Sequence, residues 1–203
     1  MGNDTHDERT IACLGWGSLI WNPELLPIRG TWQTDGPMVK VEFVRQSMDS
    51  RMTLVLHEEA TPVRALWILM DCANKTAAKQ ELYKREFRKR KIDDMRKVNK
   101  NIGAWKKGEN GSAGFPDTIL DLEKWASSRG IDAVVWTNLK HQFNGKKDRI
   151  PTVDEVIYHL SCLDKAARKL AEEYVRKTPP QIDTMYRRKI ERCLGWYPTK
   201  SIE

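Results

Sequence analysis

The chain has 203 residues, of which 40% are hydrophobic and 31% are charged. This composition is typical of a globular protein and excludes an intrinsically disordered chain, and no apolar run approaches the roughly 18 residues of a membrane-spanning helix. We therefore expect a single domain over 1–203, with a core over 11–140 and a helical C-terminal extension over 150–203 packed on it.

The formal net charge of +7 is concentrated in one segment. Residues 79–107 hold twelve Lys or Arg against four Asp or Glu, a balance of +8 that leaves −1 for the rest. Clustered positive charge attracts phosphate backbones or acidic partners, whereas a solvated helix face and loop is the alternative. No nucleic-acid-binding motif accompanies the run, which favours the solvated face. Nucleic acid remains a possible partner, a membrane is not expected, and the oligomeric state stays open.

Four scattered cysteines argue for a reducing environment. Cys13, Cys72, Cys162 and Cys193 form neither a C-x-x-C motif nor a Cys/His cluster at zinc spacing. We expect reduced thiols, a cytoplasmic location and no metal site. A Cys/His hydrolase stays open as a separate interpretation, because catalytic partners can meet only on folding, although no motif joins the cysteines to the four histidines.

The first half of the chain predicts strands that follow one another closely. Residues 11–16 form a short apolar strand that runs into a Gly-x-Gly-Ser turn. Residues 39–47, 51–57 and 63–70 predict three further strands, separated by turn residues. Such close spacing favours an antiparallel meander over a βαβ unit.

Alternation within 39–47 assigns side chains to the two faces of that strand. Val39, Val41 and Phe43 share an apolar face, and Arg45 and Ser47 continue it. The intervening positions, Lys40 and Glu42, are expected on the opposite, polar face.

A glutamate interrupts the apolar face of the next element. If 74–91 is helical, Leu82, Tyr83 and Glu86 share one face, because positions three and four apart lie over one another. A carboxylate buried there is costly unless it is paired, which suggests a functional residue. The alternative is an exposed ion pair between Glu86 and Arg90, one turn later.

The rest of the chain predicts mainly helices. Residues 118–128 predict a helix and 131–137 a compact apolar strand. Thr152 and Glu155 form a capping box at the start of a helix, and further helices are expected over 164–177 and 181–194.

The turn at residues 15–19, Gly-Trp-Gly-Ser-Leu, is too short for a dinucleotide fingerprint and is not a P-loop. A turn of this kind at a strand end can present successive backbone N–H groups to a carboxylate or a developing oxyanion. A simple tight turn is the alternative.

The segment 16–23, Trp-Gly-Ser-Leu-Ile-Trp-Asn-Pro, resembles the Tyr-Gly-Ser-Leu signature that opens the γ-glutamylcyclotransferase-like superfamily, especially its ChaC type. Residues 45–51, Arg-Gln-Ser-Met-Asp-Ser-Arg, resemble the arginine and serine hairpin of ChaC-type proteins. Residues 82–86 fall where the superfamily places a helix that ends in its catalytic glutamate.

This resemblance implies an α+β fold, a mixed or antiparallel β-barrel with flanking helices. It also implies a transferase or lyase reaction in which the α-amine of a γ-glutamyl amine or peptide attacks its own γ-carbonyl and releases 5-oxoproline. Neither a metal nor an organic cofactor is needed for that chemistry.

The resemblance also implies roles for individual residues. Glu86 would be the general base that takes a proton from the α-ammonium group. Gly17, Ser18 and Leu19 would anchor the γ-glutamyl group through backbone donors, with Trp16 beside them where tyrosine is usual.

Three residues of the hairpin are further candidates for substrate binding. Arg45 could hold the α-carboxylate of the substrate by a bidentate pair, with Ser47 and Arg51 beside it. The alternative for these side chains is a structural ion pair inside the barrel, with Glu86 as one possible partner.

The chain also departs from the family pattern. After Glu86 it continues Phe-Arg-Lys-Arg-Lys, where ChaC-type proteins commonly have a glycine-tyrosine stretch. This difference leaves the substrate open, glutathione included. The alternative function is a non-catalytic binding module that uses 79–107 for nucleic acid or an acidic partner.

Overall fold

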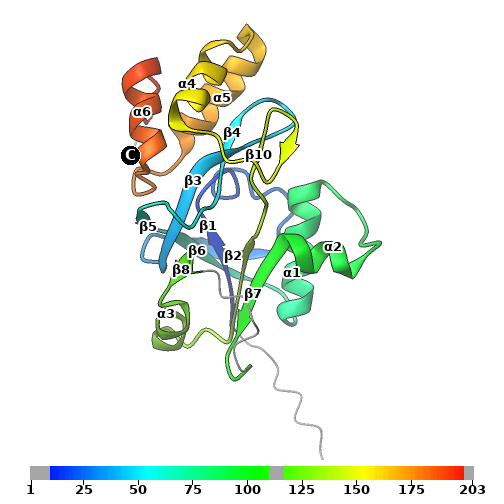
Figure 1. Cartoon of the computed structure of the whole chain (residues 1–203). Helices are drawn as coiled ribbons and strands as arrows, with labels where there is room; N and C mark the ends of the chain where they lie inside the picture. Colours follow the sequence, from blue (N-terminus) through cyan, green and yellow to red (C-terminus); the bar gives the residue numbers. More distant parts are fainter. Residues whose placement is uncertain (1–9, 110–116, 199–203) are drawn as a thin grey trace, which may run out of the picture.

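The structure is a computed structural model that describes residues 10–109 and 117–198, and its fold is α+β with mixed sheets. The strands are β1 (Ile11–Gly15), β2 (Ile28–Gln33), β3 (Met38–Gln46), β4 (Met52–Leu56), β5 (Pro62–Arg64), β6 (Leu66–Met70), β7 (Ile102–Lys106), β8 (Ile119–Leu120), β9 (Ala133–Thr137), β10 (Gln142–Phe143) and β11 (Lys146–Lys147). The helices are α1 (Lys75–Phe87), α2 (Met95–Asn101), α3 (Leu122–Ser128), α4 (Val153–Ser161), α5 (Lys165–Lys177) and α6 (Met185–Leu194). Figure 1 shows α4, α5 and α6 together at one end of the molecule.

The expectation of a β-barrel is wrong. The described strands form two sheets, one of five strands in the order β2-β6-β1-β9-β7 and one of six. The second sheet is built around β3, which pairs with β5 and β8 near its N-terminal end and with β4 and β10 farther along. Strands β2 and β7 are the two edges of the first sheet and do not pair with the second, so no closed barrel forms within the described chain.

The predicted antiparallel meander holds only for the β3–β4 hairpin. Strand β1 lies at the centre of the first sheet, antiparallel to β6 and parallel to β9. A short apolar run cannot reveal a partner that arrives so much later in the chain, and β2, β7, β10, β11 and α2 were also not predicted. The helix expected over 118–128 begins only at Leu122, and strand β8 precedes it. The predicted strand over 63–70 is interrupted at Ala65, whose N–H donates to the Pro37 carbonyl.

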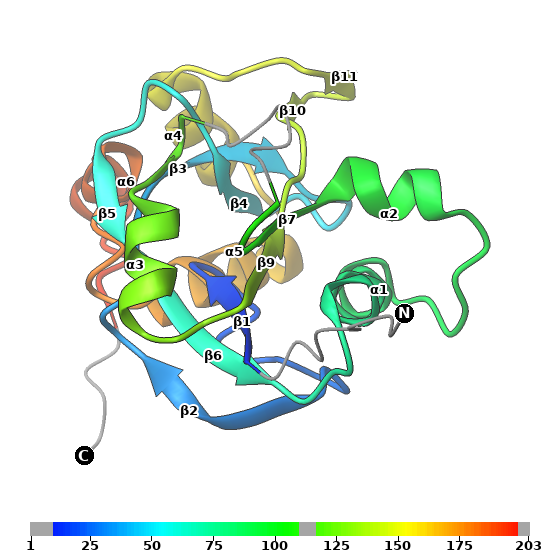
Figure 2. The same ribbon diagram turned by 90° about the horizontal axis from the view of Figure 1, so that it is seen from below.

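Strand β1 is apolar throughout because both of its faces are covered. Ile11 and Cys13 belong to a cluster shared with α1, while Ala12 and Leu14 belong to the cluster between the sheets and α3. Figure 2 accordingly shows α1 and α3 on opposite sides of β1, β6 and β9. The end of β1 therefore delivers the following turn to a fixed place beside α1.

Helix α1 begins and ends at residues with cap geometry. Asn74 is the N-cap, and its side chain accepts a hydrogen bond from the Ala77 N–H. Arg88 adopts the left-handed conformation with φ of 50° and ends the helix, so the prediction that it extends to Lys91 is wrong. This ending places Glu86 in the last turn.

Glu42 corrects the predicted alternation of β3. Its side chain is buried, with 2% of the residue exposed, although the pattern placed it on the polar face. The carboxylate accepts hydrogen bonds from the Thr184 hydroxyl at 2.5 Å and from the Tyr186 N–H at 3.2 Å, at the start of α6. The β3–β4 register also shifts between Glu42 and Arg45, so simple alternation fails there.

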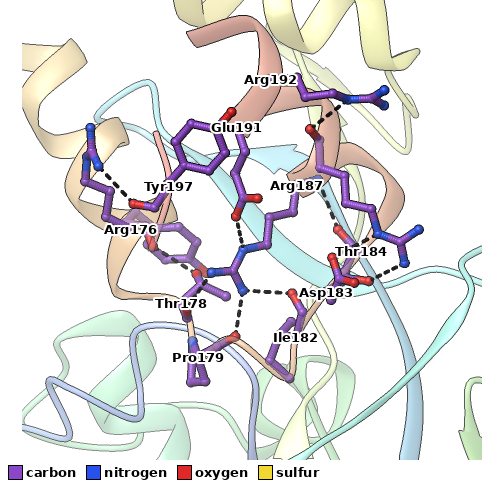
Figure 3. A network of polar contacts seen from close by, with 12 residues as sticks. Arg176, Thr178, Pro179, Ile182, Asp183, Thr184, Arg187, Glu191, Arg192 and Tyr197 are labelled. Atoms are coloured by element: carbon purple, nitrogen blue, oxygen red, sulfur yellow. Dashed lines mark hydrogen bonds and ion pairs between the residues drawn. The ribbon is translucent and has the colours of Figure 1, made fainter. Parts of the chain in front are cut away.

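A buried arginine joins α6 to the segment that precedes it (Figure 3). Arg187 is 1% exposed and donates from Nε to Glu191 at 2.9 Å. Its other nitrogens donate to the carbonyl oxygens of Thr178, Pro179 and Ile182. One side chain thus satisfies three carbonyl groups in the α5–α6 connection.

The three C-terminal helices have the expected order, and the capping box of Thr152 and Glu155 is present at the start of α4. The last helix begins at Met185, four residues later than predicted, because Gln181–Thr184 forms the connection. No helix in the described ranges combines the length and apolar character needed to cross a membrane.

Candidate active site

Residues 17–22, after the end of β1, form two overlapping hydrogen-bonded turns. The N–H of Ile20 donates to the Gly17 carbonyl at 3.0 Å, and that of Asn22 donates to the Ser18 carbonyl at 2.9 Å. Trp16 and Leu19 are buried and hold the two ends of the turn in the core. The N–H groups of Ser18 and Leu19, within the first of these turns, meet no acceptor among the described residues.

Arg85 connects this turn to Glu86. One terminal nitrogen, Nη2, donates to the Asn22 carbonyl at 2.6 Å and lies 3.4 Å from Ser18 Oγ, while Nη1 contacts Glu86 Oε2 at 3.1 Å. Adjacent helix residues project in different directions, so the two side chains must bend toward each other to meet. The Arg85 side chain is 8% exposed and acts as a buried link between the two parts of the site.

Glu86 lies at the edge of the apolar face, not in its middle. Its side chain is 23% exposed, whereas Leu82 and Tyr83 are buried. The carboxylate pairs with Arg85 and not with Arg90, which lies beyond the end of α1. Only Oε2 is engaged, and Oε1 meets no donor in the described part of the chain.

Arg45 lies close enough to Glu86 for an electrostatic interaction. Burial lowers the pKa of its guanidinium, and the charge of Glu86 acts in the opposite direction. Nη1 donates to the Lys140 carbonyl at 2.6 Å. No ion pair joins Arg45 directly to Glu86 in the described ranges, so the alternative of a structural pair between these two side chains is not realised.

Ser47 and Arg51 are occupied within their own turn. The Ser47 hydroxyl donates to Asp49 at 2.5 Å, and Arg51 pairs with the same carboxylate at 2.8 Å. Both partners hold the pKa of Asp49 below its ordinary value. The Arg51 guanidinium also lies over the Tyr174 ring, 5.5 Å from its centroid, so it borders the site.

Tyr174 is a site residue that the sequence analysis did not identify. It comes from α5, is 5% exposed, and its hydroxyl accepts a hydrogen bond from the Leu54 N–H at 3.3 Å. A Cβ added to Gly17 would lie 2.4 Å from this oxygen, so the hydroxyl is packed directly against the turn. Burial raises the pKa of Tyr174 to about 12, which keeps the phenol protonated. Its only sequence signal is a tyrosine in the apolar stripe of 164–177.

The positive segment 79–107 is partly neutralised within itself. Lys84 pairs with Glu81, Arg96 with Asp94 and Lys97 with Asp93. These contacts reduce the charge available to an acidic partner. In the described part of the chain, no three His, Cys, Asp or Glu side chains gather as they would around a metal ion.

The arrangement combines a carboxylate with one free oxygen, two free N–H groups and a protonated phenol. It can therefore accept a proton while donating hydrogen bonds to an anionic group. No family model, curated protein or solved structure matches the chain.

Proposed function

We propose that the protein is a γ-glutamylcyclotransferase-type enzyme that acts on a γ-glutamyl amine or γ-glutamyl peptide. The observation that carries the proposal is the Arg85 link, which joins the carboxylate of Glu86 to the turn that bears Ser18. The proposal rests on this site and does not need a barrel. The four cysteines are free thiols, and we place the reaction in the cytoplasm.

In the proposed reaction, Glu86 Oε1 accepts a proton from the α-ammonium group of the substrate. The free amine attacks the γ-carbonyl carbon, the first proton passes from Glu86 to the departing nitrogen, and the amide C–N bond breaks. Glu86 then takes the second proton from the nitrogen that has become the lactam N–H and passes it to the released amine. The products are 5-oxoproline and an amine, so atoms and charge balance without a co-reactant.

The remaining groups of the site would bind and orient the substrate. The N–H groups of Ser18 and Leu19 can donate to the carbonyl oxygen as negative charge develops on it. Arg45 carries the positive charge that a substrate α-carboxylate requires. Arg85 is a positioning residue, because it reaches the reaction through Glu86.

The test is release of 5-oxoproline from a panel of γ-glutamyl amines and dipeptides. We expect Glu86→Gln to lower kcat by roughly 10²- to 10⁴-fold, the usual contribution of a general base. Binding of the substrate should change far less, because the amide keeps the size of the side chain.

Glu81→Gln is the matched control, because Glu81 lies on the same helix in a partly exposed pair with Lys84. It should leave kcat unchanged. Product release that survives in Glu86→Gln would remove Glu86 as the base. The absence of product from wild type across the panel would overturn the proposed activity, and salt-dependent binding of nucleic acid would then support the binding-module alternative.

A further inference from the structure

A cavity of about 460 Å³ is formed by residues other than those of the candidate active site. Its walls come from the segment 56–59 at the end of β4, from β7, and from the chain around and after the end of β9. Small-molecule sites commonly have volumes of roughly 300–1,000 Å³. The cavity is therefore large enough for a ligand of the size of a nucleobase.

Three lining side chains carry a buried polar atom that has no hydrogen-bond partner among the described residues. These atoms are Nε1 of Trp136, Oγ1 of Thr118 and Nε2 of His141. Trp136 is 2% exposed and Thr118 is 3% exposed. An unpaired buried polar group costs about 1–3 kcal/mol, so three around one cavity call for a common explanation.

The hydrogen-bonding chemistry of the three atoms defines which ligand groups could pair with them. The Trp136 indole N–H can only donate, and the Thr118 hydroxyl can donate or accept. His141 interacts through its other nitrogen with the Leu56 backbone, and burial lowers its pKa. Its ring is therefore neutral, with Nε2 as an acceptor. A matching ligand presents an acceptor and a donor together.

The charges that line the cavity restrict the ligand further. Glu58, Glu59 and Asp148 contribute carboxylates, and Lys140 contributes one ammonium group. Burial also lowers the pKa of His57, so this second histidine adds no positive charge at neutral pH. A negatively charged ligand is disfavoured by this balance.

We propose that this cavity binds a small molecule that has an amide-type edge, a carbonyl oxygen beside an N–H group, and no net negative charge. The carbonyl oxygen accepts from Trp136 and Thr118, and the N–H donates to His141. The proposal is independent of the proposed function, because it requires no residue of the candidate active site.

Nicotinamide and nicotinate test the proposal as a matched pair. They share the same ring, but nicotinamide carries an amide where nicotinate carries a carboxylate. Heteronuclear NMR observes the indole N–H signals, and Trp136→Phe assigns the Trp136 signal by its loss. We expect nicotinamide, and uracil as a second amide-type probe, to shift this signal with saturation. Nicotinate should bind at least about tenfold more weakly.

The Trp32 indole is an internal control, since its N–H is also unpartnered but Trp32 does not line the cavity. Its signal should not move. If neither amide-type probe shifts the Trp136 signal, or if nicotinate binds as tightly as nicotinamide, the proposal is wrong.

Thr118→Val separates a binding role from a structural role. Loss of one hydrogen bond should weaken nicotinamide binding by roughly two- to tenfold. The unliganded protein should not lose stability, because the change removes an unpaired hydroxyl. Unchanged binding in this variant would contradict the assignment of the site. Glu86→Gln should bind nicotinamide as wild type does, so failure of the proposed activity remains distinguishable from failure of this proposal.

Discussion

The contact between Gly17 and Tyr174 determines the shape of the candidate active site at the level of single residues. The tyrosine hydroxyl occupies the space where any other residue at position 17 would place its Cβ. The glycine is thus required by close approach of a side chain, and the Gly-Ser-Leu turn and α5 depend on each other.

A double-mutant cycle tests this dependence. We expect Gly17→Ala to destabilise the protein by about 1–3 kcal/mol, because the new methyl group overlaps the Tyr174 hydroxyl. Tyr174→Phe should cost about 1 kcal/mol, because the Leu54 N–H loses its acceptor. The double variant should be more stable than the sum predicts by about 1 kcal/mol, since the next ring atom lies farther from the added Cβ, at 3.3 Å.

Urea unfolding of the four proteins gives the coupling energy. If the effects of the two substitutions simply add, the methyl group at position 17 does not contact the Tyr174 hydroxyl. Such additivity would also remove the argument that α5 shapes the turn.

At the level of elements, the connection between α5 and α6 depends on Arg187. The change Arg187→Met leaves the carbonyl groups of Thr178, Pro179 and Ile182 without their donor and Glu191 without its partner. We expect a loss of about 3–5 kcal/mol in the free energy of unfolding, as for other broken buried pairs.

The next residue is a matched control. Arg188 is exposed and pairs with Asp183, so Arg188→Met should leave stability nearly unchanged. Chemical denaturation of both variants makes the comparison. Equal, small effects would show that the carbonyl groups find other donors when Arg187 is removed.

The sequence predicted those elements whose signals are local. The capping box of Thr152 and Glu155 marked the start of α4, because both residues that form it lie within one turn. The length of α1 was overestimated, because the left-handed conformation of Arg88 is unusual for a residue other than glycine and leaves no compositional signal.

Features that depend on distant contacts could not be predicted in this way. Tyr174 belongs to no local sequence motif, and its hydrogen-bond partner Leu54 lies 120 residues away in the chain. Glu42 is buried because α6 returns to it, which alternation within β3 cannot indicate. The candidate site was predicted in part, from the turn at Gly17 and from Glu86, and the cavity around Trp136 was not predicted at all.

At the scale of the whole molecule, the Glu42 carboxylate joins residues 142 positions apart, in β3 and at the start of α6. Burial raises the pKa of this carboxyl above its ordinary value of 4.5. The folded state therefore binds the proton more tightly than the unfolded state does. Protonated Glu42 thus contributes to stability, and this contribution is fully present below pH 4.5 and is lost as the pH rises through the pKa of the folded state.

The unfolding free energy of wild type should consequently fall relative to that of Glu42→Gln as the pH rises through this window. Urea unfolding of both proteins across a pH series measures it. The exposed Glu123, replaced by Gln, controls for the loss of one carboxylate. A difference that grows with pH would show that hydrogen bonds to the ionised form outweigh the effect of burial.

The central position of β1 also has a consequence for synthesis of the chain. This strand leaves the ribosome before the other described strands, and its parallel neighbour β9 follows more than one hundred residues later. Until β9 arrives, a fully apolar strand has one unpaired edge, which is a template for aggregation. We therefore expect chains that end before β9 to aggregate more readily than chains that include it.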